Sequence, residues 1–333
     1  MQRIFLYNEV PMLYQFILDD ETRNTVVLIG SILAFVFTFI GLRVFENKLP
    51  RDGGREFAVD GSKSIGKPRG AGIIFIIVFT VISIIFGKFS VEYLIYFLIV
   101  ILCMLTGYMD DASSSPWGEL KKGILDLAVA VMTAFAYIRY NGSDVHFALA
   151  GIDVHFHPVV FALFAIALVW VSINVTNCCD GVDGLCGTVS IASVVSIYAL
   201  ALMLGRSVEL GANVLFMIMV LLAYLWYNST PSRVLMGDAG SRAIGAFLAI
   251  AALLTGAPFM YLLMCLIILL DGGLGLLKLT VIRVFKWKSF LKNVRTPIHD
   301  HLRKKRGWSN TQVVNRMLIL QVLISLIALG MVK

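Results

Sequence analysis

The sequence predicts an all-α protein that crosses a membrane about ten times. Three observations support this fold class: 59% of the 333 residues are hydrophobic, only 15% are charged, and apolar runs of span length recur along the whole chain. A typical soluble domain has about 25% charged residues, and it cannot bury so many long apolar runs in one core. We therefore expect a single integral-membrane domain over residues 1–333.

The expected spans follow from length, because about 20 apolar residues rising 1.5 Å each cross the roughly 30 Å hydrocarbon layer. The N-terminus lacks the form of a signal peptide, since three acidic residues follow a weak apolar stretch that has no small-residue cleavage site, so we expect the first span to direct insertion. Tight links, such as residues 87–90 and 256–258, favour antiparallel neighbours in a bundle. In chain order the spans are 25–44, 72–87, 92–108, 124–140, 159–176, 188–204, 211–226, 240–255, 258–283 and 312–331.

The basic residues predict the orientation of the chain. Its net charge of +7 comes from Lys and Arg concentrated in the loops after odd-numbered spans. In membrane proteins such loops are cytoplasmic, so the charge needs no nucleic-acid partner. An even number of spans then places both termini outside. The cytoplasmic loops are expected at about 45–71, 109–123, 177–187, 227–239 and 284–311.

Residues 174–187 contain the strongest indication of a site. If this stretch is a helix end, Asn177, Asp180 and Asp183 recur every third residue and share one face. Carboxylates at a membrane edge are costly unless they pair, bind a cation or meet water. An ordinary cap and turn is the alternative, since Asp and Gly are common there. The register of the three residues favours a metal-binding cluster.

Two further acidic positions lie at ends of predicted spans. Asp110 and Asp111 end the third span, where acids oppose the helix dipole, so a functional role is favoured over a simple boundary. Asp238 lies near the first turn of the eighth span. It is either an ordinary N-cap or a hard oxygen ligand suited to Mg²⁺. Lys121 and Lys122 follow the first pair, and either one suits a phosphate.

Basic and histidine residues complete the predicted cytoplasmic face. Lys67 opens a basic, glycine-containing turn before the second span, a pattern that suits an anion but is common. His299 and His301 flank an acid in the most basic loop, which suggests diphosphate binding or, alternatively, a patch attracted to anionic lipid. On the outer side, His146, His155 and His157 lack an acidic or Cys partner at useful spacing, and we expect solvated loop residues.

Acids for one divalent cation, cations for phosphate oxygens and access to the bilayer are predicted on the same face. This combination suits transfer of a phosphoryl-linked group from a nucleotide donor to a lipid acceptor. An ion-coupled transporter is the alternative from another class, but only Asp126 and Asp271 lie at mid-span. A non-catalytic lipid-binding scaffold has no need of the carboxylates.

Together these motifs resemble the polyprenyl-phosphate N-acetylhexosamine-1-phosphate transferase superfamily, from about Lys48 to the C-terminus. Two features, at residues 226–228 and 307–309, favour its muramoyl branch. Several positions depart from the pattern: His299-Asp300-His301 stands for the usual triple histidine, and Leu302-Arg303 for the usual Phe-Glu. The landmarks of the resemblance are residues 107–111, 174–185, 227–241 and 297–308.

The resemblance implies transfer of phospho-MurNAc-pentapeptide from UDP-MurNAc-pentapeptide to undecaprenyl phosphate, which gives lipid I and UMP. It also implies Mg²⁺ as cofactor, a homodimer, and a cytoplasmic active site in the bacterial inner membrane. The alternative within the superfamily is a GlcNAc-1-phosphate transferase for teichoic acid or O-antigen synthesis. Direct attack by the lipid phosphate is the preferred mechanism, with a covalent phospho-enzyme as the other possibility.

Matching motif positions carry the implied roles onto this chain. The catalytic residues are Asp110, Asp111, Asp180, Asp183 and His299; the substrate-binding residues are Lys67, Lys121, Asn177, Asn228 and His301; and the magnesium ligands are Asp238 and Asp180.

Overall fold

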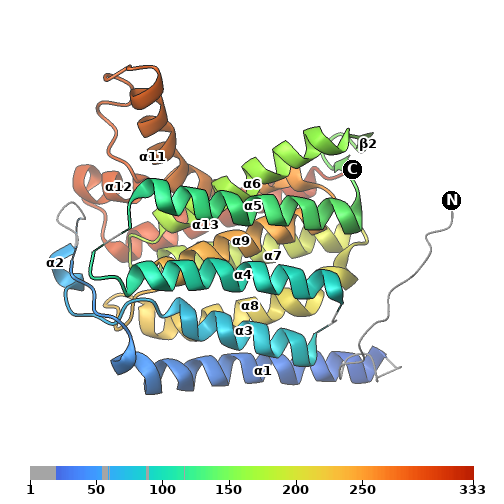
Figure 1. Cartoon of the computed structure of the whole chain (residues 1–333), viewed down its shortest axis with the longest axis horizontal. Coiled ribbons are helices and arrows are strands. Elements are labelled where there is room, and N and C mark those ends of the chain that lie inside the picture. The colour runs from blue at the N-terminus through green and yellow to red at the C-terminus, as the bar shows by residue number, and fades with distance from the viewer. Residues whose placement is uncertain (1–19, 55–58, 60, 88–89, 116) are drawn as a thin grey trace.

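The computed structural model describes residues 20–54, 59, 61–87, 90–115 and 117–333, and these form a bundle of long helices (Figure 1). The only sheet among them is a two-stranded antiparallel hairpin. The elements are α1 (Asp20–Phe45), η1 (Glu46–Lys48), α2 (Gly61–Ser64), α3 (Gly72–Phe86), α4 (Val91–Asp111), α5 (Glu119–Asn141), β1 (Asp144–Phe147), β2 (Ile152–His155), α6 (Pro158–Cys179), α7 (Leu185–Met203), α8 (Ser207–Asn228), α9 (Gly237–Leu254), η2 (Pro258–Met260), α10 (Tyr261–Met264), α11 (Leu266–Val284), α12 (Ile298–Arg306) and α13 (Asn310–Gly330).

The predicted all-α, multi-pass fold is confirmed. Within the described residues, eight helices are long and apolar enough to cross a membrane, or nine if the bent pair 258–264 and 266–284 counts as one span. Every expected span overlaps a helix, but α3 has only 15 residues, which is short for a straight crossing. The count of ten therefore stays a prediction.

The ninth span is not the continuous helix expected over residues 258–283. It bends by 89° at Cys265, between α10 and α11. The bend frees backbone groups, and Gln321 of α13 bonds both sides of the break: its Oε1 accepts from Ile267 N at 2.9 Å and its Nε2 donates to Leu263 O at 3.1 Å. A broken helix is tolerated within a membrane where a buried partner bonds the freed backbone groups in this way.

Helix α9 is the centre of the bundle, and all 18 of its residues are buried. Glycines on its neighbours allow very close approach to its first turn. A Cβ at Gly107 of α4 would lie 2.4 Å from the Asp238 carbonyl, and one at Gly72 of α3 would lie 2.0 Å from Gly240 N. Small residues let membrane helices pack backbone to backbone. The end of α4 and the start of α9 are therefore held in contact.

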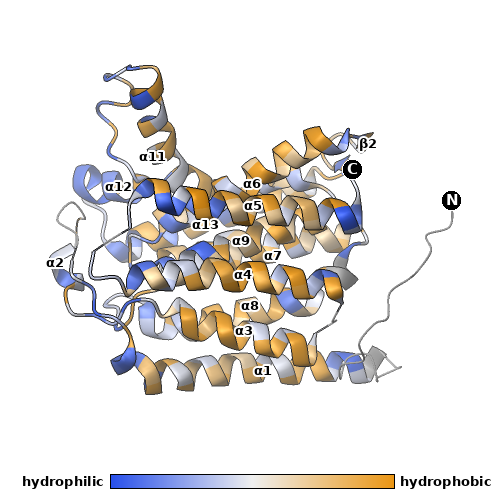
Figure 2. Ribbon diagram, in the orientation of Figure 1, coloured by the Kyte–Doolittle hydropathy of each residue, from blue (hydrophilic) through white to orange (hydrophobic). Residues whose placement is uncertain are grey.

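Hydrophobic residues cover the helices along their length, and hydrophilic ones gather at the two ends of the bundle (Figure 2). One end carries α2, α12 and their loops, while the other carries the hairpin and the C-terminus (Figure 1). At the hairpin end Lys333 N donates to Ala148 O, and α1 begins at the same end. The first described helix therefore begins, and the last one ends, at the same end of the bundle, and the assignment of that side as the outside stays a prediction.

The hairpin corrects one expectation, since His146 and His155 do have acidic partners. The strands pair His146 with Asp153 and His155 with Asp144, and each Nδ1 contacts the opposite carboxylate. The partners are 7 and 11 residues apart, so only the cross-strand register brings them together.

Candidate active site

Asp111 caps a helix other than its own. Its oxygens accept the backbone N–H groups of Asp238 at 3.1 Å and Ala239 at 3.0 Å, and Arg69 Nε lies 2.8 Å from Oδ1. These amides belong to the first turn of α9, where no intrahelical partner exists and the dipole favours an anion. The unfavourable position at the end of α4 is thus offset by a favourable one at the start of α9.

Asp110 faces a different set of partners. Its Oδ1 accepts the backbone N–H of Trp117 at 2.7 Å, and its Oδ2 pairs with Lys122. The same ammonium lies 2.9 Å from Asp238 Oδ2, while Arg69 donates to Asp238 Oδ1 at 3.2 Å. Two cations thus join three buried carboxylates from α4 and α9 into one cluster.

Backbone pairing places Arg69 in this cluster. Leu235 N donates to Pro68 O at 2.8 Å, and Ala71 N and Gly72 N each donate at 3.1 Å to the carbonyls of Leu235 and Met236. The loop before α3 is thereby joined to the loop before α9. Arg69 also approaches Asp52 at 3.6 Å, which holds the guanidinium among three carboxylates.

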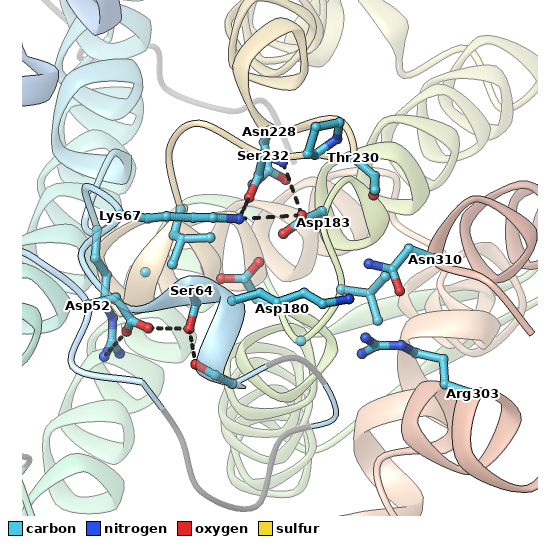
Figure 3. Close-up of a pocket in the computed structure, with 18 residues that line it drawn as sticks. Asp52, Ser64, Lys67, Asp180, Asp183, Asn228, Thr230, Ser232, Arg303 and Asn310 are labelled. Atoms are coloured by element: carbon cyan, nitrogen blue, oxygen red, sulfur yellow. Dashed lines mark hydrogen bonds and ion pairs between the residues drawn. The ribbon is translucent and has the colours of Figure 1, made fainter.

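A pocket of about 390 Å³ opens beside the cluster (Figure 3). Lys67 and Asp183 form one side of it: Lys67 Nζ donates to Ser232 Oγ at 2.8 Å and lies 3.8 Å from Asp183 Oδ2, and Ser232 N donates to the same oxygen at 3.1 Å. The lining residues are Asp52, Gly61, Lys63, Ser64, Lys67, Arg69, Asp180, Gly181, Val182, Asp183, Asn228, Thr230, Pro231, Ser232, Leu235, Gly237, Arg303 and Asn310.

The register argument for Asn177, Asp180 and Asp183 is wrong in its geometry. Helix α6 ends at Cys179, so Asp180 is its C-cap and Asp183 lies in the turn before α7. The turn brings both carboxylates to the pocket, whereas Asn177 donates to Ser241 Oγ of α9 at 2.9 Å. The grouping of the two acids is therefore produced by a turn, and a shared helical face plays no part.

Asn228 joins the two loops that border the pocket. Its Oδ1 accepts from Gly184 N at 2.8 Å, and its Nδ2 donates to Val234 O at 2.8 Å. Although Asn228 lines the pocket, both ends of its amide are used by the backbone. Its predicted substrate contact stays a prediction, and its structural role is clear.

His299 packs under the turn that carries Asp180. Its backbone N–H donates to Asp271 Oδ1 at 2.7 Å and its Nδ1 lies 2.7 Å from Oδ2, so Nδ1 carries the proton and Nε2 faces Gly181. Burial lowers the pKa of the ring, but the Asp271 carboxylate outweighs it and raises the pKa above its usual value. The Nδ1 atom of His301 instead accepts a hydrogen bond from the backbone N–H of Arg295 at 3.2 Å.

The structure separates the two candidate lysines. Lys121 lies over the Trp117 ring at 3.2 Å from its centroid, while Lys122 joins Asp110 to Asp238. The predicted substrate contact at Lys121 remains untested. The sequence offered Lys122 only as an alternative to Lys121, and Arg69 only as part of the basic turn. It gave no indication of Asp52 or Arg303.

The carboxylates fit Mg²⁺ of the kind that bridges to a substrate. Among the described residues, no three His, Cys, Asp or Glu side chains are grouped closely enough to hold a metal ion alone. Mg²⁺ commonly takes one or two carboxylates and completes its shell with phosphate and water. Asp180 suits this role because it lines the pocket, and both oxygens of Asp238 are held by Arg69 and Lys122.

The class of protein to which the chain belongs follows from its similarity to known proteins. Residues 93–256 match glycosyl transferase family 4, and this match includes the site residues of α4, α5, α6 and α9. Three relatives are each named phospho-N-acetylmuramoyl-pentapeptide-transferase. That of Treponema pallidum is 37% identical over 92% of this chain and 90% of its own; that of Clostridium acetobutylicum is 29% identical over 91% and 98%; and that of Staphylococcus carnosus is 27% identical over 91% and 98%.

The chain belongs to the phospho-N-acetylmuramoyl-pentapeptide-transferase family. It is a multi-pass bacterial membrane enzyme of the phosphoglycosyl transferase class, as the apolar helices and the relatives together show.

Proposed function

We propose that the chain transfers phospho-MurNAc-pentapeptide from UDP-MurNAc-pentapeptide to undecaprenyl phosphate, which yields lipid I and UMP in peptidoglycan synthesis. The observation that carries this proposal is the meeting of carboxylates, cations and a pocket at one end of the bundle. Such a site holds a charged diphosphate donor beside the bilayer, where a lipid acceptor resides. The names of the full-length relatives support the same reaction.

In this reaction the protein mainly positions and neutralises charged groups. Lys67, held by Ser232 and Asp183, supplies a cation at the pocket wall for the donor. Lys122 and the Trp117 amide orient the Asp110 carboxylate, which takes the proton from the lipid phosphate in the proposed direct attack. Asp111 fixes the first turn of α9 and, through Arg69, the loop that carries Lys67.

We propose Mg²⁺ as the cofactor, with Asp180 as ligand and Asp238 as a second ligand once Arg69 and Lys122 move aside. When bound, the ion neutralises the diphosphate and polarises its oxygens. The two carboxylates of the turn before α7 support this role, since Asp180 and Asp183 repel diphosphate oxygens placed beside them unless a cation lies between.

We further propose that this end of the bundle faces the cytoplasm and that the chain assembles as a homodimer. The excess of Lys and Arg in the loops at this end supports the orientation. Cytoplasmic access also matches the chemistry, because a nucleotide donor is a water-soluble substrate. The homodimer follows from the resemblance alone.

The test is release of UMP by the purified protein with undecaprenyl phosphate and either UDP-MurNAc-pentapeptide or UDP-GlcNAc. We expect turnover with the muramoyl donor only, its loss on chelation of Mg²⁺, and its return when the metal is restored. Asp180→Asn is expected to raise the Mg²⁺ concentration for half-maximal rate. Turnover with UDP-GlcNAc in place of the muramoyl donor would assign the chain to the alternative reaction.

A further inference from the structure

Helix α11 and the chain that follows it form an arm that extends away from the rest of the bundle (Figure 1). Two hydrogen bonds hold the returning chain against the helix. Lys278 Nζ donates to Val294 O at 2.7 Å, and nearer the bundle His299 N donates to Asp271 Oδ1 at 2.7 Å. The chain therefore turns back at the far end of the arm and runs along α11 to reach α12.

The far end of this arm, residues 284–292, mixes exposed aromatic and basic side chains. We call these residues the arm tip, and their sequence is Val-Phe-Lys-Trp-Lys-Ser-Phe-Leu-Lys. Phe285 is 72% exposed and Trp287 is 56% exposed, with the Trp287 ring centroid 5.2 Å from that of Phe290. The exposed lysines of the arm tip are Lys286, Lys288 and Lys292. Clustered exposed aromatic rings mark a surface that contacts something other than water.

The charge of the arm restricts what that contact can be. Residues 272–299 contain no Asp or Glu. Arg283, just before the arm tip, pairs with Glu119 of α5 at 2.9 Å, so its charge is already shared with the bundle. The three lysines of the arm tip have no acid in their own segment. A surface of this kind attracts an anionic partner.

The position of the arm brings its tip to the edge of the bilayer. Because α11 is bent by 89° from α10, it leaves the side of the bundle, and its tip lies toward the end that carries α12 (Figure 1). Hydrophilic residues gather at that end (Figure 2). At the boundary between bilayer and water, aromatic rings lie at the level of the headgroups and lysines extend their ammonium groups to the aqueous side. Basic segments with aromatic residues bind there more strongly when the lipids are anionic.

We propose that the arm tip binds the headgroups of anionic phospholipids in the leaflet at the α12 end of the bundle. Phe285 and Trp287 enter the boundary between headgroups and acyl chains, while the lysines pair with lipid phosphates. This proposal needs neither the reaction nor the orientation proposed above. Because the returning chain is bonded to α11 as far as Asp271, a tip held by lipid also holds α12 at a fixed depth.

The experiment places a fluorescent label beside the arm tip in the full-length protein. Asn293, which is exposed, is changed to Cys and labelled with bimane maleimide, with the native Cys178 changed to Ser. The protein is reconstituted in mixed vesicles of phosphatidylcholine and phosphatidylglycerol. A small fraction of one lipid or the other carries a quenching spin label near the top of an acyl chain. We expect labelled phosphatidylglycerol to quench at least about twofold more than labelled phosphatidylcholine.

Two matched triple variants separate binding at the arm tip from general attraction of charge. The test variant combines Lys286→Gln, Lys288→Gln and Lys292→Gln. The control variant combines Lys304→Gln, Lys305→Gln and Arg306→Gln, which remove the same charge from exposed positions of α12. We expect the preference for phosphatidylglycerol to disappear in the test variant and to stay within about a third of its original value in the control.

The aromatic residues are tested by Phe285→Ser combined with Trp287→Ser. This change is expected to weaken quenching by both lipids and to shift the bimane emission to longer wavelength, because the label then meets water. Equal quenching by the two lipids in the labelled protein with a native arm tip overturns the proposal. An equal loss of preference in the two triple variants also overturns it, since general attraction then explains the result. Absence of quenching by either lipid overturns it as well, and places the arm tip in water or against a second copy of the chain.

Discussion

At the scale of single residues, adjacent acids in the same sequence motif have different roles. Asp110 is held by Lys122 and the Trp117 amide, whereas Asp111 caps α9 and holds Arg69. The sequence indicates that both are unusual at a helix C-terminus, but the partner helix that receives Asp111 is 127 residues away. Pairings of this separation cannot be inferred from local patterns.

Lys122 is expected to matter more for catalysis than Lys121. Lys122→Met leaves two buried carboxylates without the ammonium that joins them, so we expect kcat to fall by about a hundredfold. Lys121→Met removes a cation from the Trp117 ring and is expected to change kcat by less than about threefold. Rates of UMP release for the two variants decide the matter, and the reverse order would support the sequence-based choice of Lys121.

Asp111 is expected to act mainly through stability. Asp111→Asn weakens the cap on Asp238 N and Ala239 N and the ion pair to Arg69, which costs about 1–3 kcal/mol of folding free energy. A lowered apparent Tm in detergent, together with residual activity in the folded fraction, is the expected result. Complete loss of activity at unchanged Tm would instead assign Asp111 a direct part in the chemistry.

His299 is expected to make stability depend on pH. Its folded-state pKa is raised above the ordinary 6.5: burial lowers it, but Asp271 and, less strongly, Asp300 and Asp180 outweigh that effect. The stabilisation that the His299–Asp271 pair gives the folded protein is therefore fully present below the unfolded-state pKa of His299. It is lost as pH rises through the folded-state pKa. The difference in Tm between wild type and His299→Gln should be larger at pH 6 than at pH 9. A difference independent of pH would show that the ring stays neutral throughout.

At the scale of helices, the length and hydropathy of the spans predicted most positions correctly, because each run has to match the bilayer thickness. Two features escaped this reasoning. The break at Cys265 depends on Gln321 of another helix, and the hairpin depends on cross-strand pairs between two short polar segments. Both rest on tertiary partners, which hydropathy does not encode.

Helices α5 and α9 also share a second ion pair, one turn below the first. Asp126 follows Lys122 by four residues and Arg242 follows Asp238 by four, and Arg242 Nε donates to Asp126 Oδ1 at 3.1 Å. Asn174 of α6 adds a contact of 3.4 Å to the same carboxylate. In the first pair the cation is on α5 and the acid on α9, and in the second pair this order is reversed. A shift of one helix by a turn would bring like charges together, so the two pairs favour a single register between the helices.

The Asp126–Arg242 ion pair can be tested by a double-mutant cycle. Arg242→Met alone leaves Asp126 charged and buried and is expected to destabilise the protein by about 3–5 kcal/mol. The double variant Asp126→Leu with Arg242→Met is expected to recover most of that loss, since an apolar pair replaces an ionic one. Apparent Tm values for the four proteins of the cycle test this. A loss in the double variant equal to the sum of the losses in the two single variants would show that the pair contributes no coupling.

At the scale of the whole molecule, the grouping of the site at one end was predictable from charge, while its internal geometry was not. Loops after alternate spans meet at one end of any up-and-down bundle, which explains why Asp110, Asp180, Asp238 and His299 were expected together. Which loop contacts which depends on close helix packing, such as that of Gly107 and Gly72 against α9.

The orientation of this polarised bundle is open to a direct test by cysteine labelling. Asp153, whose side chain is 83% exposed on the hairpin, and Lys288, in the exposed loop after α11, mark the two ends. With the native Cys178 changed to Ser to lower background, we expect Asp153→Cys to react with a membrane-impermeant maleimide that has access only to the periplasmic or outer side. Lys288→Cys should react only after the membrane is opened, because the Lys and Arg that surround it retain their loop in the cytoplasm. Retained UMP release in both variants is the control for folding. The opposite labelling pattern would place the carboxylate cluster on the outer face, away from any cytoplasmic nucleotide donor, and would contradict both the orientation and the reaction proposed for the site.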